Sequence, residues 1–260
     1  MKNIKSIIEI LGNNKPRIAL IACMHGNERA GLEIFKLLRK RGLKVPVKLI
    51  IANQYALKKN KRFLKSDLNR VFPGKKNGNL EEKLAYEITQ EIVGMDYVID
   101  LHSCSVESLP FAIVRNKKTL SKAFGTNLKH YVLYPLQKQG GASAIDFANY
   151  GIGLELGKHD RKKTIKDGFT AVVKLLRSIE LNIQKSKPTG ASIFKITGSI
   201  YKNKNFKMNS KIVNFSKVKK GEPIAYEKEK TIRAEKEFYP ILYGENSYKN
   251  ILCLKAKEVV

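Results

Sequence analysis

Short apolar runs alternate with amphipathic stretches over the first two thirds of the chain. Residues 18–22 and 97–101 are continuous enough to be buried strands, and residues 45–52 alternate in polarity as a strand does. Residues 80–93 and 164–183 carry apolar residues at helical spacing. Shorter elements are expected as strands at 4–10, 111–114, 131–133 and 151–157, and as a helix at 143–149. This order predicts an α/β fold, with a mixed, mostly parallel sheet covered by helices on both faces.

The pattern changes after residue 183. Residues 184–190, Gln-Lys-Ser-Lys-Pro-Thr-Gly, have the composition of a linker. No helical spacing follows them, and the apolar runs are short and broken by Gly, Asn and Lys. These β-like runs lie at 192–200, 211–215, 223–226 and 251–254. We therefore predict an α/β domain over residues 1–187 and a small β-rich C-terminal domain over residues 188–260.

Residues 54–79 form a long polar stretch with turn signals at Pro73-Gly74 and Asn77-Gly78. A loop of this length inside a compact domain usually carries function or is disordered. It contains Arg62 and Arg70, whose planar guanidinium groups match a carboxylate or an oxyanion. In so basic a chain, the two arginines are equally compatible with a place on the surface.

The formal net charge of +27 is large and suggests an anionic partner. Lysine is scattered through both halves, without a long basic block or the interleaved aromatic residues of a nucleic-acid platform. These features argue against nucleic acid as the main ligand, although a basic nucleic-acid-binding protein remains the non-enzyme alternative. Steering of a small anionic substrate follows more simply from the same charge.

The chain offers no apolar run long enough to span a bilayer, and its N-terminus lacks the apolar stretch of a signal peptide. Cys23, Cys104 and Cys253 are odd in number and far apart, which argues against a disulfide framework. We therefore expect a cytoplasmic protein without a membrane partner. The sequence does not specify the oligomeric state.

Candidate metal ligands follow two of the expected strands. His25 and Glu28 come directly after residues 18–22, and His102 follows residues 97–101. Sites in open α/β sheets form at the carboxyl ends of the strands, so these three side chains should meet there. Two histidines and one carboxylate with an open fourth position are typical of catalytic zinc. Asp100 lies two residues before His102 on the same strand face and can orient its imidazole.

The candidate histidines and carboxylates also allow structural interpretations. The spacing of His25 and Glu28 is a weak pattern, and a histidine in a loop is often solvated or structural. His130 and His159 have no such partners and are interpreted as structural or surface residues. Glu155 lies within an apolar strand, where a carboxylate is costly unless it is paired or functional. Burial would raise its pKa, which suits a general base and acid, but a salt bridge would also explain it.

Four motifs occur in a specific order: His25-Gly-Asn-Glu28, Asp67-Leu-Asn-Arg70, Asp100-Leu-His102 and Gly-Leu-Glu155-Leu-Gly. Together they resemble the succinylglutamate desuccinylase/aspartoacylase family, which comprises zinc-dependent deacylases related to the zinc carboxypeptidases. The resemblance covers residues 18–157. It extends weakly to Tyr239-Pro240 and Glu245-Asn-Ser-Tyr248 near the C-terminus. It implies a zinc carboxypeptidase-like fold.

The resemblance also implies roles for the matched residues around the metal. His25, Glu28 and His102 would bind one zinc ion per chain. Glu155 would activate the zinc-bound water and pass its proton to the leaving amine.

The remaining roles concern the substrate. Arg62, eight residues before Arg70 as in aspartoacylase, would polarise the scissile carbonyl and hold the developing oxyanion. Asn69 and Arg70 would bind a substrate carboxylate. Tyr248 would close the pocket from the second domain. It is equally compatible with an ordinary half-buried aromatic residue of a β domain.

One departure from the family concerns the segment before Glu155. Aspartoacylase carries a substrate-binding Tyr and Arg there, whereas this sequence has Gly141 and Ile145. The clamp for an aspartate side chain is therefore missing, which argues against N-acetylaspartate, and no succinyl-specific pocket is evident.

The sequence as a whole predicts a zinc-dependent amidohydrolase acting on a linear amide. It would convert a small, anionic N-acyl amino acid to a carboxylate and a free amine. A carboxypeptidase-like peptidase, or an amidase of another small substrate, is the alternative that shares the zinc site.

Overall fold

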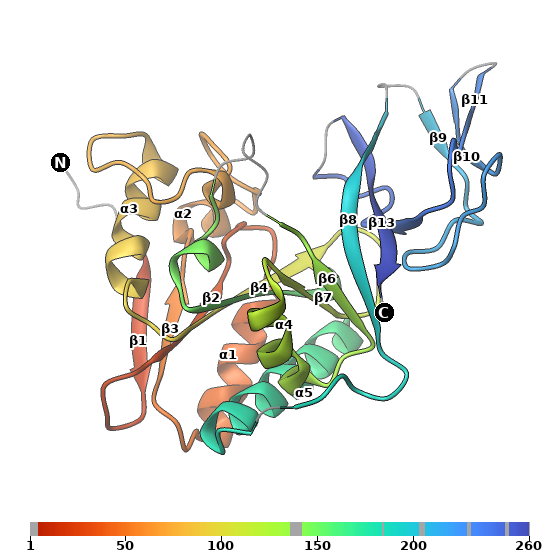
Figure 1. Cartoon of the computed structure of the whole chain (residues 1–260). Helices are drawn as coiled ribbons and strands as arrows, with labels where there is room; N and C mark the ends of the chain where they lie inside the picture. Colours follow the sequence, from red (N-terminus) through yellow and green to blue (C-terminus); the bar gives the residue numbers. More distant parts are fainter. Residues whose placement is uncertain are drawn as a thin grey trace.

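The sheet of the α/β region continues into the C-terminal part of the chain through β8, β13 and β12 (Figure 1). The computed structural model describes residues 5–135, 142–183, 185–202, 206–227, 230–247 and 250–259. Within these residues, ten strands form one sheet. Their spatial order is β1 (Ile7–Leu11), β3 (Val47–Ile51), β2 (Ile18–Ala22), β4 (Tyr97–Cys104), β7 (Tyr150–Lys158), β5 (Phe111–Val114), β6 (His130–Leu133), β8 (Ser192–Tyr201), β13 (Ile251–Val259) and β12 (Tyr239–Ile241).

The centre of this sheet is parallel, with β3, β2, β4 and β7 as consecutive neighbours. Every residue of β2 and β4 is buried, as a parallel strand covered on both faces requires. The pairs β5–β6 and β6–β8 are also parallel, whereas the pairs β1–β3, β7–β5, β8–β13 and β13–β12 are antiparallel. The predicted mixed, mostly parallel sheet is therefore confirmed.

Helices cover both faces of the sheet. Alternate residues of β2 belong to different cores: Leu20 lies in the core that α1, α4 and α5 help to form, and Ile21 lies in the core that contains α3. Figure 1 shows α1, α4 and α5 together on one side. The helices are α1 (Ala30–Arg41), α2 (Gln54–Lys58), α3 (Leu80–Ile92), α4 (Lys117–Ala123) and α5 (Lys162–Glu180), with 3-10 turns η1 (Leu68–Arg70), η2 (Phe124–Thr126) and η3 (Ala144–Phe147).

Several features differ from the sequence-based expectation. Residues 211–215, expected as a β-like run, contain no strand, and the helix expected at 143–149 is only the 3-10 turn η3. The short helices α2 and α4 were not predicted, because each is stabilised by an asparagine N-cap, Asn53 or Asn116, and by a few buried residues rather than by a long amphipathic pattern. The strand β4 does not end at His102 but continues to Cys104. Its pairing with β7 shifts register between these two residues, an irregularity of the kind that often lies beside active sites.

The C-terminal part extends the main sheet and adds a second one. β8 pairs in parallel with β6, so backbone hydrogen bonds cross the predicted boundary at residue 188. A separate antiparallel sheet of β11 (Lys230–Arg233), β10 (Pro223–Glu227) and β9 (Phe206–Met208) lies at the upper right of Figure 1. That residues 1–187 and 188–260 form two separate domains remains a proposal.

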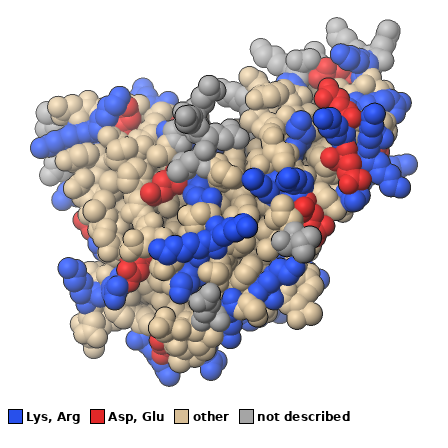
Figure 2. All heavy atoms as spheres, viewed as in Figure 1, with Lys and Arg blue, Asp and Glu red and all other residues tan. Residues whose placement is uncertain are grey.

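Charged side chains cover the surface of both parts. In Figure 2, lysine and arginine lie over the α/β part and over the β9–β11 region, with acidic side chains among them. Among the helices that the structure describes, none combines the length and apolarity that crossing a membrane requires.

Candidate metal centre and its pocket

The loop after β2 brings His25 and Glu28 to the carboxyl edge of the sheet. Cys23 adopts a positive φ of 54°, which turns the chain sharply as it leaves the strand. Gly26 then passes so close to α2 that a Cβ on it would lie 2.1 Å from the carbonyl carbon of Ala56, so only glycine fits. The backbone N–H of Glu28 donates to the carbonyl of His25 at 3.1 Å, which closes the turn just before α1.

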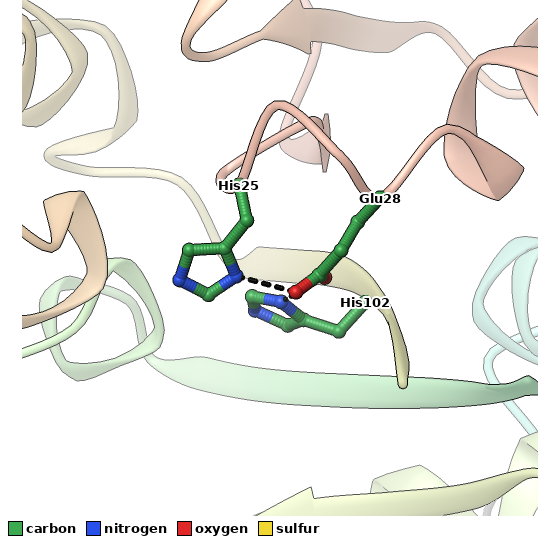
Figure 3. A group of neighbouring side chains, drawn as sticks. All are labelled: His25, Glu28 and His102. Carbon is green, nitrogen blue, oxygen red and sulfur yellow. Dashed lines mark hydrogen bonds and ion pairs between the residues drawn. The ribbon is translucent and has the colours of Figure 1, made fainter. Parts of the chain in front are cut away.

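His25, Glu28 and His102 converge, as the sequence predicts. Figure 3 shows the two imidazoles and the carboxylate of Glu28 directed toward one another. The Nδ1 atoms of His25 and His102 lie 2.7 Å and 2.9 Å from the two oxygens of Glu28. One nitrogen or oxygen from each of the three residues lies within 4.8 Å of the others, and all three residues are buried. The sequence separation of 77 residues is bridged by the parallel pairing of β2 with β4.

Two further carboxylates hold the outer nitrogens of the imidazoles. Asp100 Oδ2 lies 2.7 Å from Nε2 of His102, and Asp67 Oδ1 lies 3.0 Å from Nε2 of His25. The position of Asp100 agrees with the expectation from strand alternation. Sequence reasoning included Asp67 in a motif but gave it no role, because a contact across 42 residues has no local signature.

The charges of Glu28 and His102 depend on each other and on the groups around them. Burial opposes ionisation of Glu28, but the adjacent His25 and His102 hold its pKa well below the ordinary value. Burial likewise opposes protonation of His102, yet Asp100 and Glu28 raise its pKa well above the ordinary value.

The residues present fit a divalent cation. With each Nε2 engaged by a carboxylate, each Nδ1 is left to act as a ligand, and outer carboxylates of this kind fix the tautomer in zinc sites. His25, Glu28 and His102 would hold such a cation, whose positive charge would balance the buried carboxylate of Glu28. Two imidazoles and a carboxylate are also the ligand types of catalytic zinc.

The loop between α2 and α3 is anchored by a buried carboxylate that the sequence did not single out. Glu81 accepts hydrogen bonds from the backbone N–H groups of Leu64, Lys65 and Ser66 at 2.7–3.2 Å. This anchoring fixes the path of the chain directly after Arg62. The guanidinium of Arg62 donates to Glu28 at 3.1 Å, which places it beside the three candidate ligands.

The candidate substrate residues of this loop lie next to the same site. Asn69 Nδ2 is 3.3 Å from Nε2 of His102, and Arg70 is exposed. Both residues line the pocket with Arg62. The structure therefore brings the predicted arginines and Asn69 to one side of the three candidate ligands. Tyr248 lies outside the described residues.

Glu155 lies on β7, in register with His102 on β4. Its Oε2 atom is buried without a hydrogen-bond partner among the described residues, and the side chain lines the pocket. Burial, together with the nearby charges of Glu28 and Glu245, raises the pKa of Glu155 to about 7, against the influence of His102. No salt bridge to Glu155 occurs in the described part of the chain.

These residues surround one cavity of about 160 Å³. Its wall contains residues that sequence reasoning missed, including Arg115, Tyr134, Leu242 and Leu254, and also Glu245, which the sequence placed in a weak motif without a role. They come from distant segments, so only the arrangement of the strands brings them together. Cys104 also lines the cavity, but burial raises the pKa of its thiol far above the ordinary value, so it is not a nucleophile at neutral pH.

The sequence matches the succinylglutamate desuccinylase/aspartoacylase catalytic domain over residues 14–180. The chain belongs to this family. It is thus a member of a family of hydrolytic deacylases, as the resemblance of the motifs predicts. No curated protein matches the sequence.

Solved structures share the fold at low identity. Murine aminoacylase 3 is 19% identical, with a TM-score of 0.79 over 95% of this chain and 97% of that chain. A succinylglutamate desuccinylase from Vibrio parahaemolyticus is 16% identical, with a TM-score of 0.72 over 97% and 86%. A product-bound ectoine utilization protein from Ruegeria pomeroyi is 18% identical, with a TM-score of 0.73 over 97% and 88%. This similarity confirms the predicted fold.

The remaining two histidines lie outside this ligand set. His130 stacks on Phe215 with ring centroids 4.3 Å apart, and His159 Nδ1 lies 2.8 Å from the hydroxyl of Ser103. Neither residue lines the cavity of this deacylase-family chain.

Proposed function

We propose that this chain is a zinc-dependent amidohydrolase that removes the acyl group from a small N-acyl amino acid. The observation that carries the proposal is the convergence of His25, Glu28 and His102 within 4.8 Å, with Asp67 and Asp100 behind the two imidazoles. Membership of a deacylase family supports the reaction class. We expect one zinc ion per chain and, from the cysteine pattern, a cytoplasmic location.

Bound zinc would supply the Lewis acidity that makes water nucleophilic and polarises a carbonyl near neutral pH. Glu155 accepts the proton of the attacking water in this proposal and donates it to the nitrogen of the leaving amine. A pKa raised to about 7 suits both steps, because the group can exist in either state near neutral pH. Its place in register with His102 puts this carboxyl beside the candidate ligands.

The arginine side of the pocket would bind the anionic parts of the substrate. Arg62 donates to the oxygen on which negative charge develops, and its position beside Glu28 supports this role. Asn69 and Arg70, nearer the solvent, would hold the substrate carboxylate, and Tyr248 would close the pocket. The net charge of +27 favours the approach of small anions in general.

A metal analysis combined with a substrate panel tests this function. Purified protein should contain close to one zinc per chain and should hydrolyse members of a panel of N-acyl amino acids. Glu155→Gln, which preserves the size of the side chain, should keep the zinc and lose nearly all turnover.

Absence of stoichiometric zinc from active protein, or full activity of Glu155→Gln, would contradict the assignment. A salt-sensitive complex with RNA or DNA in a protein without zinc would favour the nucleic-acid alternative.

A further inference from the structure

The polarity of the sheet surface changes abruptly beside Glu155. On one side of β7, Asp100 and His102 of β4 are in register with Gly153 and Glu155. On the other side, Ile113 and Phe111 of β5 are in register with the same two residues. Residues two apart on a strand share a face, so Gly153 and Glu155 point the same way. The general base of the proposed reaction therefore has polar neighbours on one strand and apolar neighbours on the next.

Gly153 leaves a small apolar slot in this surface. A Cβ placed on it would lie 3.6 Å from Cβ of Ile113 and 4.0 Å from Cδ1 of Ile145, which are ordinary van der Waals distances. Gly153 does not have a positive φ, so the backbone conformation at this position does not require glycine. Ile113 and Ile145 line the cavity beside Gly153. Leu242 and Leu254 line it too, and they belong to the apolar cluster against which Ile113 packs.

The guanidinium group of Arg115, which lines the cavity, is already hydrogen-bonded to other groups of the protein. Nε and Nη2 of Arg115 donate to Asp146 at 2.7 Å and 3.3 Å. Nη1 donates to the carbonyl of Tyr134 at 3.1 Å, and Nη2 also donates to Ser143 at 3.0 Å. All three guanidinium nitrogens thus have protein partners. Four of its five N–H groups are used in this way, so the planar fork that would bind a substrate carboxylate is already held by Asp146.

A second carboxylate lies on this side of the cavity. Glu245 is buried, and its oxygens accept hydrogen bonds from the backbone N–H groups of Ser105 and Ser247 at 2.7 Å and 3.1 Å. Like charges in a desolvated pocket repel one another. A negatively charged group of the substrate would therefore be disfavoured near Glu155 and Glu245.

We propose that the slot formed by Gly153, Ile113 and Ile145 selects substrates that carry an uncharged aliphatic group next to the scissile amide. This inference rests on the proposed deacylase function and narrows its substrate class to monocarboxylic N-acyl amino acids. The aliphatic group can come from the amino-acid side chain or from the acyl chain, since both flank the amide. In either case, one carboxylate remains for the arginine side of the pocket.

A set of matched substrates tests the preference and identifies its source. The kcat/KM of N-acetylleucine should exceed that of N-acetylaspartate, a charged substrate of similar size, by at least about tenfold. A rise from N-acetylalanine to N-acetylleucine would place the side chain in the slot, and a rise from N-acetylglycine to N-hexanoylglycine would place the acyl chain there. Equal or faster hydrolysis of N-acetylaspartate or N-succinylglutamate would overturn the inference. If no member of the panel is hydrolysed, the proposed function fails instead.

The variant Gly153→Ala tests the slot itself. The added methyl group meets Cβ and the backbone oxygen of Ile113 at 3.6 Å and 3.8 Å and Cδ1 of Ile145 at 4.0 Å, all ordinary contact distances, so the fold should tolerate it. We expect kcat/KM for the best aliphatic substrate to fall by about tenfold or more, and to fall less for N-acetylglycine. Ile152→Val is the matched control, because Ile152 neighbours Gly153 but packs into the core on the opposite face. An equal loss on both substrates in Gly153→Ala, with unchanged zinc content and melting temperature, would refute the slot.

Discussion

The two strands that flank β7 give the pocket two chemically different sides. On the β4 side, Asp100 and His102 join Glu28 and His25 in a chain of contacts of 2.7–2.9 Å. On the β5 side, Ile113 offers only carbon. On the polar side, the charges of Glu28 and His102 depend on the groups around them, whereas an aliphatic surface acts by shape. The comparison predicts that changes on the β4 side alter metal binding and turnover, and that changes on the β5 side alter the choice of substrate.

The largest effect is expected from His102→Ala on the polar side. This change removes one of three ligand candidates and leaves Glu28 and Asp100 with fewer partners in a buried site. Zinc affinity should fall by more than about 100-fold, beyond the range for loss of a residue that only supports a ligand. Metal titration monitored by a competing chelator measures it. His130→Ala should leave the affinity unchanged, and equal affinities of the two variants would remove His102 from the site.

A smaller loss is expected from Asp100→Asn, which preserves shape and removes the charge. The carboxylate accepts from Nε2 of His102 at 2.7 Å, and loss of such a partner typically lowers metal affinity by about 10–100-fold. The same titration tests it, with Asp96→Asn as the control at the opposite end of the strand. Unchanged affinity in Asp100→Asn would show that the polar side does not act as one unit.

The next effect concerns the pH dependence of stability and Glu155, which lies between the polar and the apolar side of the pocket. Burial raises the pKa of Glu155 from its ordinary 4.5 to about 7, so between these values the folded protein holds a proton that the unfolded chain releases. The free energy of unfolding of the metal-free protein should therefore fall as pH rises from 4.5 to 7, relative to Glu155→Gln. The total change is about 3 kcal/mol.

Urea unfolding of the metal-free proteins at several pH values measures this difference. Glu235→Gln, which changes an exposed carboxylate, should run parallel to the unmodified chain across the range. A pH-independent difference between the Glu155→Gln variant and the unmodified protein would show that the carboxyl titrates normally and that the apolar side does not reach it.

The two sides also differ in how far the sequence predicts them. The polar side is encoded locally: Glu28 follows His25 by three residues, Asp100 precedes His102 by two, and strand alternation places the latter pair on one face. The order of the parallel strands then brings the pairs together by a general rule of α/β sheets. The predicted fold and ligand set therefore follow from short-range pattern.

The apolar side has no such local code. Ile113 faces Gly153 only because β5 pairs antiparallel with β7, a junction that no spacing in the sequence indicates. The contact of Glu245 with Ser105 spans 140 residues and depends on the continuation of the sheet from β6 into β8 and β13. Aliphatic residues in these places look like any other core residues until the strand order is known.

The smallest effect is expected from Glu245→Ala, which tests how the C-terminal segment holds its part of the pocket. Glu245 accepts from the backbone N–H of Ser105 at 2.7 Å, and the N–H of Asn246 donates back to the Ser105 hydroxyl at 2.9 Å. Removing the carboxylate should loosen this link by about 1 kcal/mol and raise KM a few-fold. The zinc content should stay the same, since Glu245 contacts none of the three candidate ligands. Glu237→Ala, at an exposed position, is the control for general effects on the C-terminal region. A fall in zinc content with unchanged KM would assign Glu245 to the polar side and break the comparison.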